Sequence, residues 1–146
     1  MSMWEPFSRS ARRTIVRAQE VAHLFGSDHI GTEHLAFVLA EGDDEVGHLM
    51  AGALDRDAIR ERLGVATGAP KGEMVFAPEA KRVIELAFVN ARRLNHDYIG
   101  VAHLALGLLD SGEPLPPGAD LAVLRSALAG AASEDDPKTA AAEPER

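Results

Sequence analysis

The sequence reads FSRSARR over residues 7–13 and DHIGTEHL over 28–35, and at an offset of 69 residues it reads FAPEAKR over 76–82 and DYIGVAHL over 97–104. Without a gap, this offset aligns small and apolar residues at helical spacing as well as distinctive polar ones. The matched pairs are Phe7 and Phe76, Ala11 and Ala80, Arg13 and Arg82, Ile15 and Ile84, Ala18 and Ala87, Ala22 and Ala91, Asp28 and Asp97, Ile30 and Ile99, Gly31 and Gly100, His34 and His103, Leu35 and Leu104, and Leu39 and Leu108. Amphipathic composition alone would not align Phe, Asp-x-Ile-Gly and His at one offset, so the chain is a tandem duplication of one helical unit.

The composition favours an all-α fold with one compact core. The chain has 146 residues, of which 46% are hydrophobic and only 5% are aromatic. A core filled mainly by Ala, Leu, Val and Ile suits close helix packing better than a β-sandwich. The sequence contains no cysteine, which excludes a disulfide framework and cysteine ligation of a metal.

Hydrophobic periodicity predicts four helices in the first unit. Its first buried stripe is formed by small and apolar residues at intervals of three and four, namely Ala11, Ile15, Ala18, Ala22 and Phe25. Ser8 is the natural N-cap of this helix, and Thr32 can cap the second one. The expected helices span residues 9–25, 33–40, 45–54 and 56–63.

The second unit repeats the first two helices over residues 78–94 and 101–110 and then departs from the pattern. Three prolines, at positions 114, 116 and 117, occupy the place of the third helix. Because proline cannot donate to a helical ladder, this segment is expected to be an extended connection. A last helix is expected from Leu121 to Ala129, which gives about seven helices in all.

The element boundaries divide the chain into four parts. Repeat one is placed at about residues 4–64 and repeat two at 76–130, with a glycine- and proline-rich linker at 65–75. Residues 131–146 contain no large apolar side chain and are expected to form a disordered acidic tail.

The net charge and the hydropathy of the sequence exclude two classes of binding partner. The formal net charge is −8, whereas contacts to nucleic-acid phosphates need a basic surface. The amino terminus has no basic stretch followed by an apolar one, and no run approaches the roughly 20 apolar residues of a membrane span. We therefore expect a cytoplasmic protein that binds neither nucleic acid nor a membrane.

The duplicated motif resembles the amino-terminal domain of the Clp AAA+ unfoldases, especially the ClpC type. Residues 7–13 followed by 30–35 look like the first half of that domain, and residues 76–87 followed by 96–100 look like the second. The resemblance covers about Trp4 to Leu128. It implies a pseudo-twofold helical bundle that, in the family, is fused to ATPase modules and binds substrates and adaptor proteins.

This resemblance implies a recognition domain rather than an enzyme. No Gly-x-x-x-x-Gly-Lys-Ser/Thr phosphate loop occurs in the sequence, so we expect a free-standing, monomeric domain without ATPase modules or cofactors. The implied partners are Clp protease components, substrate or adaptor proteins, and peptide-like small molecules. The expected role is to modulate Clp-dependent proteolysis or to sequester such ligands.

Some members of the family bind phosphorylated arginine through the glutamate of Gly-Thr-Glu-His. By this resemblance the first repeat has a candidate site at Ser8, Thr32, Glu33 and His34. In the second repeat Val101 and Ala102 replace Thr and Glu, and Ala77 removes a hydroxyl at the helix start, so one site per chain is expected. The structural alternative is that Thr32 and Glu33 only cap the helix and place an acidic group in its first turn.

A second surface in the family accepts hydrophobic peptide-like ligands, including cyclic peptides. The matching positions here are Trp4, Phe76, Lys81 and Glu85, where aromatic side chains would supply apolar area and the charges would fix orientation. The alternative for the phenylalanines is structural, with Phe7 and Phe76 serving as packing anchors at the start of each repeat.

A small metal-dependent hydrolase is the rival function, because the chain has six histidines. The sequence has no His-Glu-x-x-His motif. His34 and His103 recur at equivalent repeat positions, which favours a structural role such as bonding to neighbouring backbone. No metal ligands are therefore assigned.

Overall fold

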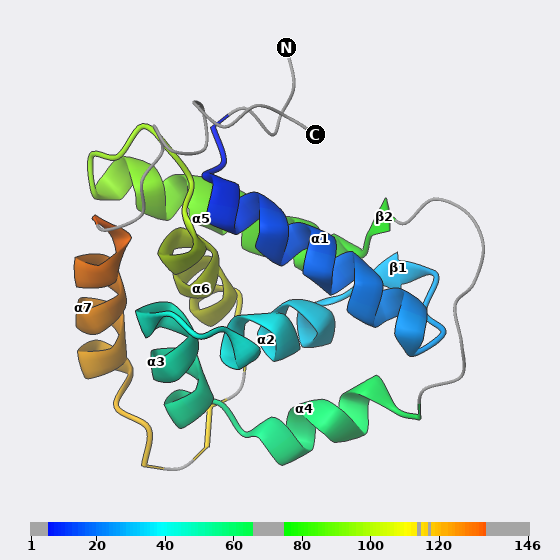
Figure 1. The fold of residues 1–146 in the computed structure, drawn as a ribbon. Coiled ribbons are helices and arrows are strands. Elements are labelled where there is room, and N and C mark those ends of the chain that lie inside the picture. The colour runs from blue at the N-terminus through cyan, green and yellow to red at the C-terminus, as the bar shows by residue number, and fades with distance from the viewer. Residues whose placement is uncertain (1–5, 66–74, 114, 117, 134–146) are drawn as a thin grey trace.

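The computed structural model describes residues 6–65, 75–113, 115–116 and 118–133. Within these residues the chain forms seven helices and two very short strands (Figure 1). In chain order they are α1 (Arg9–Leu24), β1 (His29–Ile30), α2 (Thr32–Glu41), α3 (Glu45–Ala53), α4 (Arg56–Leu63), β2 (Val75–Phe76), α5 (Pro78–Arg93), α6 (Val101–Asp110) and α7 (Leu121–Ala132). The predicted all-α fold, with a second unit one helix short, is confirmed.

The two long helices, α1 and α5, begin and end as their sequences dictate. Ser8 caps α1 by accepting a hydrogen bond from the N–H of Ala11 at 3.1 Å, whereas α5 begins with Pro78, whose fixed φ suits a first helical position. Beyond the last turn, Gly26 has a φ of 74° and Asn95 a φ of 64°. Residues in this left-handed region reverse the chain, which sends it back toward the next helix.

The two repeats exchange their opening segments. Ile30 of the first repeat pairs with Phe76 of the second in a parallel register, and Phe7 of the first repeat forms a parallel bridge with Ile99 of the second. The backbone bonds repeat the symmetry, because Ser8 N–H donates to the Ile99 carbonyl and Ala77 N–H to the Ile30 carbonyl, both at 2.8 Å. Each repeat therefore depends on the other for the start of its long helix.

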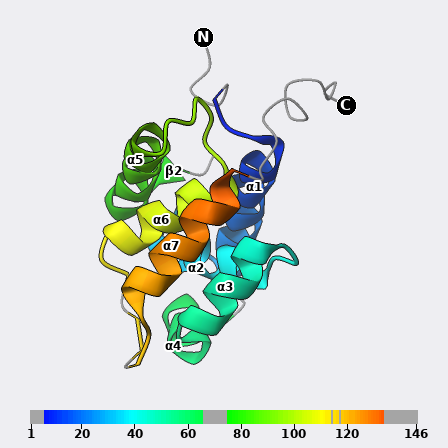
Figure 2. The ribbon, with the colours of Figure 1, turned by 90° about the vertical axis from the view of Figure 1, so that its left-hand side faces the viewer.

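The helices form layers around a central pair. Helices α2 and α6 contact each other in the middle, α1 and α5 lie over them on one side, and α3, α4 and α7 lie on the other (Figures 1 and 2). Phe7 is 1% exposed and meets Phe88 of α5 edge to face, with ring centroids 5.8 Å apart. The expectation that Phe7 is a packing anchor is confirmed.

Helices α5 and α6 approach closely at Gly107. A Cβ at this position would lie 2.4 Å from the Val83 carbonyl oxygen and 2.9 Å from the Ala87 nitrogen. In the first repeat the equivalent position is Val38. The second repeat thus has a tighter helix pair, and nine residues of α6 are buried, from Val101 to Leu109.

Two boundary predictions need correction. Thr32 is not the N-cap of α2, because Gly31 takes that position and the His34 ring supplies the capping acceptor. The last helix does not end near Gly130, because α7 runs to Ala132 and both Ala131 and Ala132 are buried. The glycine interrupts neither the helix nor its buried face.

Candidate functional site

The loop that precedes α2 in the first repeat is held in shape by His34, whose side chain caps that helix. Its Nδ1 accepts a hydrogen bond from the Gly31 N–H at 2.8 Å, and burial lowers the pKa of His34. His103 and Gly100 make the same bond at 2.8 Å in the second repeat, and burial, followed by the charge of His96, lowers the pKa of His103 to about 4. The predicted structural role of both histidines is confirmed.

Glu33 folds back over this loop. Its Oε1 lies only 2.5 Å from the place that a Cβ on residue 31 would occupy, so the glycine makes room for the carboxylate. The side chain is half-buried in the first turn of α2, and no hydrogen bond or ion pair reaches it from the described part of the chain. A carboxylate at a helix N-terminus is stabilised by the helix dipole while it remains able to accept hydrogen bonds from a ligand.

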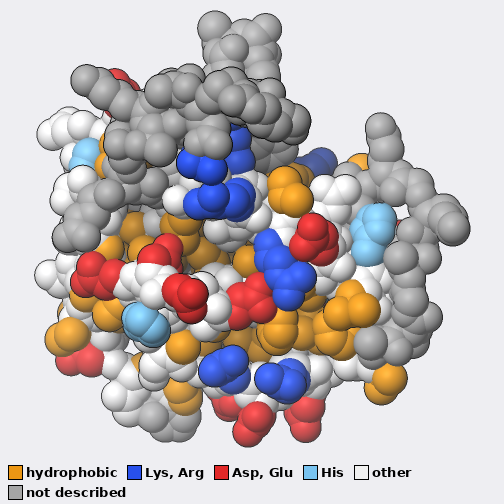
Figure 3. Space-filling model, viewed as in Figure 1, with side chains coloured by type: hydrophobic (Ala, Val, Ile, Leu, Met, Phe, Trp, Pro, Cys, Tyr) orange, Lys and Arg blue, Asp and Glu red, His pale blue; other side chains and the backbone are white. Residues whose placement is uncertain are grey.

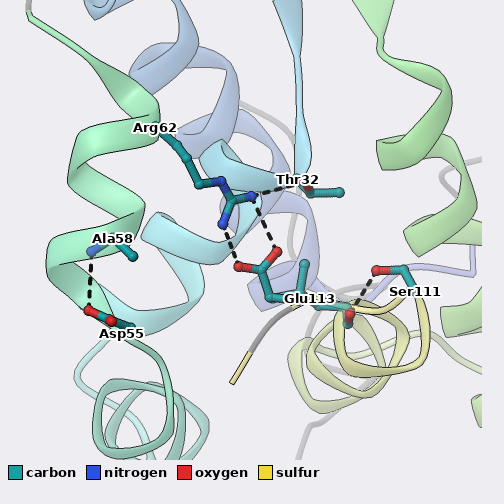
Figure 4. Close-up of polar contacts among 7 residues, drawn as sticks. Thr32, Asp55, Ala58, Arg62, Ser111 and Glu113 are labelled. Carbon is teal, nitrogen blue, oxygen red and sulfur yellow. Dashed lines mark hydrogen bonds and ion pairs between the residues drawn. The ribbon is translucent and has the colours of Figure 1, made fainter. Parts of the chain in front are cut away.

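A guanidinium from α4 lies beside this loop, as Figure 4 shows. Arg62 binds Glu113 in a bidentate ion pair, with Nη1 to Oε2 at 2.7 Å and Nη2 to Oε1 at 3.3 Å. Its Nη2 also donates to the Thr32 hydroxyl at 3.4 Å. The Glu113 side chain is 3% exposed, and its hydrogen bond is the main cause of the raised pKa of Arg62, with smaller contributions from the charges of Glu113 and Glu33. Sequence reasoning missed this pair, since Arg62 and Glu113 belong to different repeats and share no motif.

The structure does not bring Ser8 to Thr32. Ser8 lies at the start of α1, beside Ile99 of the second repeat, whereas Thr32 begins α2 directly after β1, and β1 lies beside the other end of α1 (Figure 1). The segment that pairs beside Thr32 ends at Ala77, which has no hydroxyl. The predicted grouping is therefore corrected to Thr32, Glu33 and His34, because the repeats exchange their opening segments.

The corresponding place in the second repeat has different chemistry. Val101 and Ala102 are both buried there, and neither can hold a guanidinium group. A groove of about 450 Å³ nearby is lined by charged, polar and apolar side chains from α1, α2 and the 42–44 loop, including Ser10, Arg13, Val38 and Asp43. The chemical difference between the repeats that the sequence predicts is therefore present in the structure, because buried Val101 and Ala102 stand where the first repeat has Thr32 and Glu33.

The predicted peptide groove is only partly assembled in the described residues, and Trp4 lies outside them. Phe76 is half-buried and packs against the core, so it also acts as a packing residue. Lys81 and Glu85 lie one turn apart on the exposed surface of α5, where Glu85 forms an ion pair with Arg82 at 3.3 Å. A separate hollow of about 500 Å³ on α1 is lined by Val16, Gln19, Glu20, His23 and Leu24, and it includes none of the predicted groove residues.

The surface around these sites carries charges of both signs. On the face shown in Figure 3, acidic and basic side chains alternate, with hydrophobic side chains between them. Among the described residues, no group of three or more His, Cys, Asp or Glu side chains is arranged to hold a metal ion. The histidine-based hydrolase therefore gains no support.

The duplicated helical bundle, with segments exchanged between its halves, defines a tandem-repeat all-α domain. Residues 6–116 match the family model of the Clp repeat amino-terminal domain. The chain belongs to this family. Within the described residues, no helix has both the length and the apolar character needed to cross a membrane.

The chain is similar in sequence to the amino-terminal regions of ClpC and ClpA proteins. It is 38% identical over 118 residues to the chloroplastic chaperone protein ClpC2 of rice, covering 77% of this chain and 13% of that protein. It is 34% identical over 137 residues to a ClpA-homologous ATP-binding subunit of the Clp protease of Cyanidium caldarium, covering 86% of this chain and 16% of that protein. The chain thus spans about a seventh of the length of these relatives.

Solved structures agree with this placement. The amino-terminal domain of the chaperone ClpD from Arabidopsis thaliana superposes with a TM-score of 0.66 at 28% identity, covering 90% of this chain and 97% of that one. The Hsp104 amino-terminal domain from Candida albicans shares the fold at 14% identity and a TM-score of 0.63, and this alignment covers 92% of this chain and 98% of that one.

Proposed function

We propose that this chain is a non-catalytic recognition module that binds peptide segments of Clp substrates or adaptor proteins and so modulates Clp-dependent proteolysis or sequesters such ligands. The observation that carries the proposal is the half-buried Glu33 carboxylate, which accepts no hydrogen bond and forms no ion pair in the described residues and lies at the start of α2. The membership of the chain in the Clp repeat family supports it. The primary ligand class is a peptide containing phosphorylated arginine.

The chemistry of the Thr32–Glu33 cradle, defined as Thr32, Glu33 and the backbone of Gly31, suits such a ligand. A carboxylate can accept two parallel hydrogen bonds from the planar guanidinium fork. The first N–H groups of a helix, here those of Thr32 and Glu33, have no partner within the helix and favour a phosphate, whereas the Gly31 N–H is already bound to His34. His34 fixes the loop through its bond to Gly31, so the cradle is ordered before a ligand binds.

Isothermal titration with phosphoarginine tests this proposal. Glu33→Gln keeps the shape but removes the charge, and it is expected to weaken binding about 10- to 100-fold, since a hydrogen bond to a charged group contributes about 1.5 to 3 kcal/mol. The matched control is Glu45→Gln, which changes an exposed acidic residue in the first turn of α3 and is expected to leave affinity unchanged.

One bound phosphoarginine per chain is expected, because Val101 and Ala102 replace the ligating residues in the second repeat. Two equal sites would contradict the assignment to the first repeat. If wild-type protein gave no heat with phosphoarginine or with phosphoarginine-containing peptides, and bound no purified Clp subunit, the proposed function would be abandoned.

A second candidate surface takes hydrophobic or cyclic peptides at Phe76, Lys81 and Glu85. It is favoured by the exposed Lys81 and Glu85 on one stretch of α5, close in sequence to the half-buried Phe76. Titration with a cyclic peptide should give weaker binding for Lys81→Ala than for wild type. Arg93→Ala, which removes an exposed cation at the far end of α5, serves as the control.

A further inference from the structure

The cation next to the cradle is held in place independently of Glu33. Arg62 directs both terminal nitrogens to Glu113, at 2.7 and 3.3 Å, and the Glu113 side chain is nearly inaccessible. A bidentate pair of this kind fixes the plane of the guanidinium as well as its position. Arg62 is therefore a fixed charge at the rim of the site.

Arg62 leaves the Glu33 carboxylate available. The described residues offer Glu33 no hydrogen bond: Arg62 donates to the neighbouring Thr32 hydroxyl, at 3.4 Å, and interacts with Glu33 through its charge alone. The guanidinium has five N–H donors, of which the contacts to Glu113 and Thr32 use three. The remaining donors can bind an anion that arrives beside Glu33.

We infer that Arg62 makes the Thr32–Glu33 cradle select phosphorylated arginine over unmodified arginine, an inference that rests on the proposed function. An unmodified guanidinium bound to Glu33 carries only N–H donors, so it can make no hydrogen bond with Arg62, whose charge Glu113 already balances. A phosphoryl group on the ligand guanidinium adds acceptor oxygens, which can take hydrogen bonds from the remaining N–H donors of Arg62.

The position of Glu113 explains why this arrangement belongs to the first repeat. Glu113 lies in the extended connection that replaces the missing helix of the second repeat, and it reaches across to α4 of the first. The pair also links these two segments, so Arg62 has a structural role in addition to the proposed one. A test must therefore separate ligand preference from stability.

The experiment compares the affinities of phosphoarginine and arginine, both with blocked amino and carboxyl groups, for full-length wild type, Arg62→Gln and Arg60→Gln. Arg60 is the matched control because it lies on the same helix and is exposed. Arg62→Gln is expected to weaken phosphoarginine binding about 10- to 100-fold, the effect of losing a charged hydrogen bond, without weakening arginine binding. Arg60→Gln should retain the wild-type preference.

Two further variants separate the possible outcomes. Arg62→Lys keeps the charge without the fork and should keep part of the preference, while circular dichroism reports whether each variant is folded. If Glu33→Gln abolishes phosphoarginine binding but Arg62→Gln and Arg62→Lys keep the wild-type ratio of affinities, the role of Arg62 is overturned and the proposed function stands. If Glu33→Gln has no effect, both are overturned.

Discussion

At the scale of single residues, the two capping histidines make stability depend on pH. Each accepts a backbone N–H through Nδ1, so each must be neutral at that nitrogen in the folded state. Burial lowers the pKa of His34 and brings that of His103 to about 4, below the ordinary histidine value of 6.5. Their contribution to stability is therefore present above pH 6.5 and is lost as the pH falls toward 4.

Urea denaturation at several pH values tests this linkage. The free energy of unfolding is expected to fall between pH 6.5 and pH 4, with a contribution from His103 of at most about 3 kcal/mol, at 1.36 kcal/mol per pKa unit. His103→Asn keeps an acceptor for the Gly100 N–H and should reduce the pH dependence. His48→Asn, at an exposed position of α3, should leave it unchanged. Identical pH profiles for wild type and His103→Asn would refute the assignment.

The sequence predicted these histidine roles because each His recurs in the same place after Ile-Gly. The sequence could not predict the ion pair between Arg62 and Glu113, since these residues are 51 positions apart and match no repeat position. It also grouped Ser8 with Thr32, because both belong to the first repeat. Only the folded chain shows that the start of α1 pairs with the second repeat.

At the scale of elements, the close contact between α5 and α6 depends on Gly107. Gly107→Ala would place a methyl group 2.4 Å from the Val83 carbonyl oxygen, so one of the helices must shift. Overpacking of this kind costs about 1 to 3 kcal/mol. Gly52→Ala is the matched control, because a Cβ there meets no atom within 4 Å and alanine favours the helix by about 0.8 to 1 kcal/mol. Chemical denaturation should show loss of stability in the first variant and a gain in the second; equal stabilities would exclude the close contact.

Helix positions were predictable because each helix has a periodic apolar face. The prolines after α6 correctly indicated the missing helix, since they remove backbone donors. The cap of α2 was predicted wrongly because Thr32 is a favourable capping residue. In the structure the capping acceptor is instead the ring of His34, which lies within the helix. The short strands β1 and β2 carried no sequence signal, because a two-residue pairing depends on contacts between the repeats.

At the scale of the whole molecule, the exchange of opening segments makes the two repeats one folding unit. The Ile30–Phe76 and Phe7–Ile99 pairings cross between repeats, and so do the contacts of α2 with α6 and of α3 with α7. Sequence self-comparison predicted the duplication but could not show this exchange. A repeat without its partner loses the backbone bonds at the start of its long helix and exposes the inner faces of its helices.

Separated halves of the chain, residues 1–65 and 66–146, test this dependence. Each half alone is expected to lack a cooperative thermal transition, because the apolar faces that it buries against the other half are exposed to water. Mixing the halves should restore native-like circular dichroism through a one-to-one complex, measured by analytical ultracentrifugation. The control is the full-length chain cleaved at a protease site inserted within residues 66–74, which should remain assembled. A single half that unfolds cooperatively near the transition temperature of the intact chain would show that the repeats fold independently.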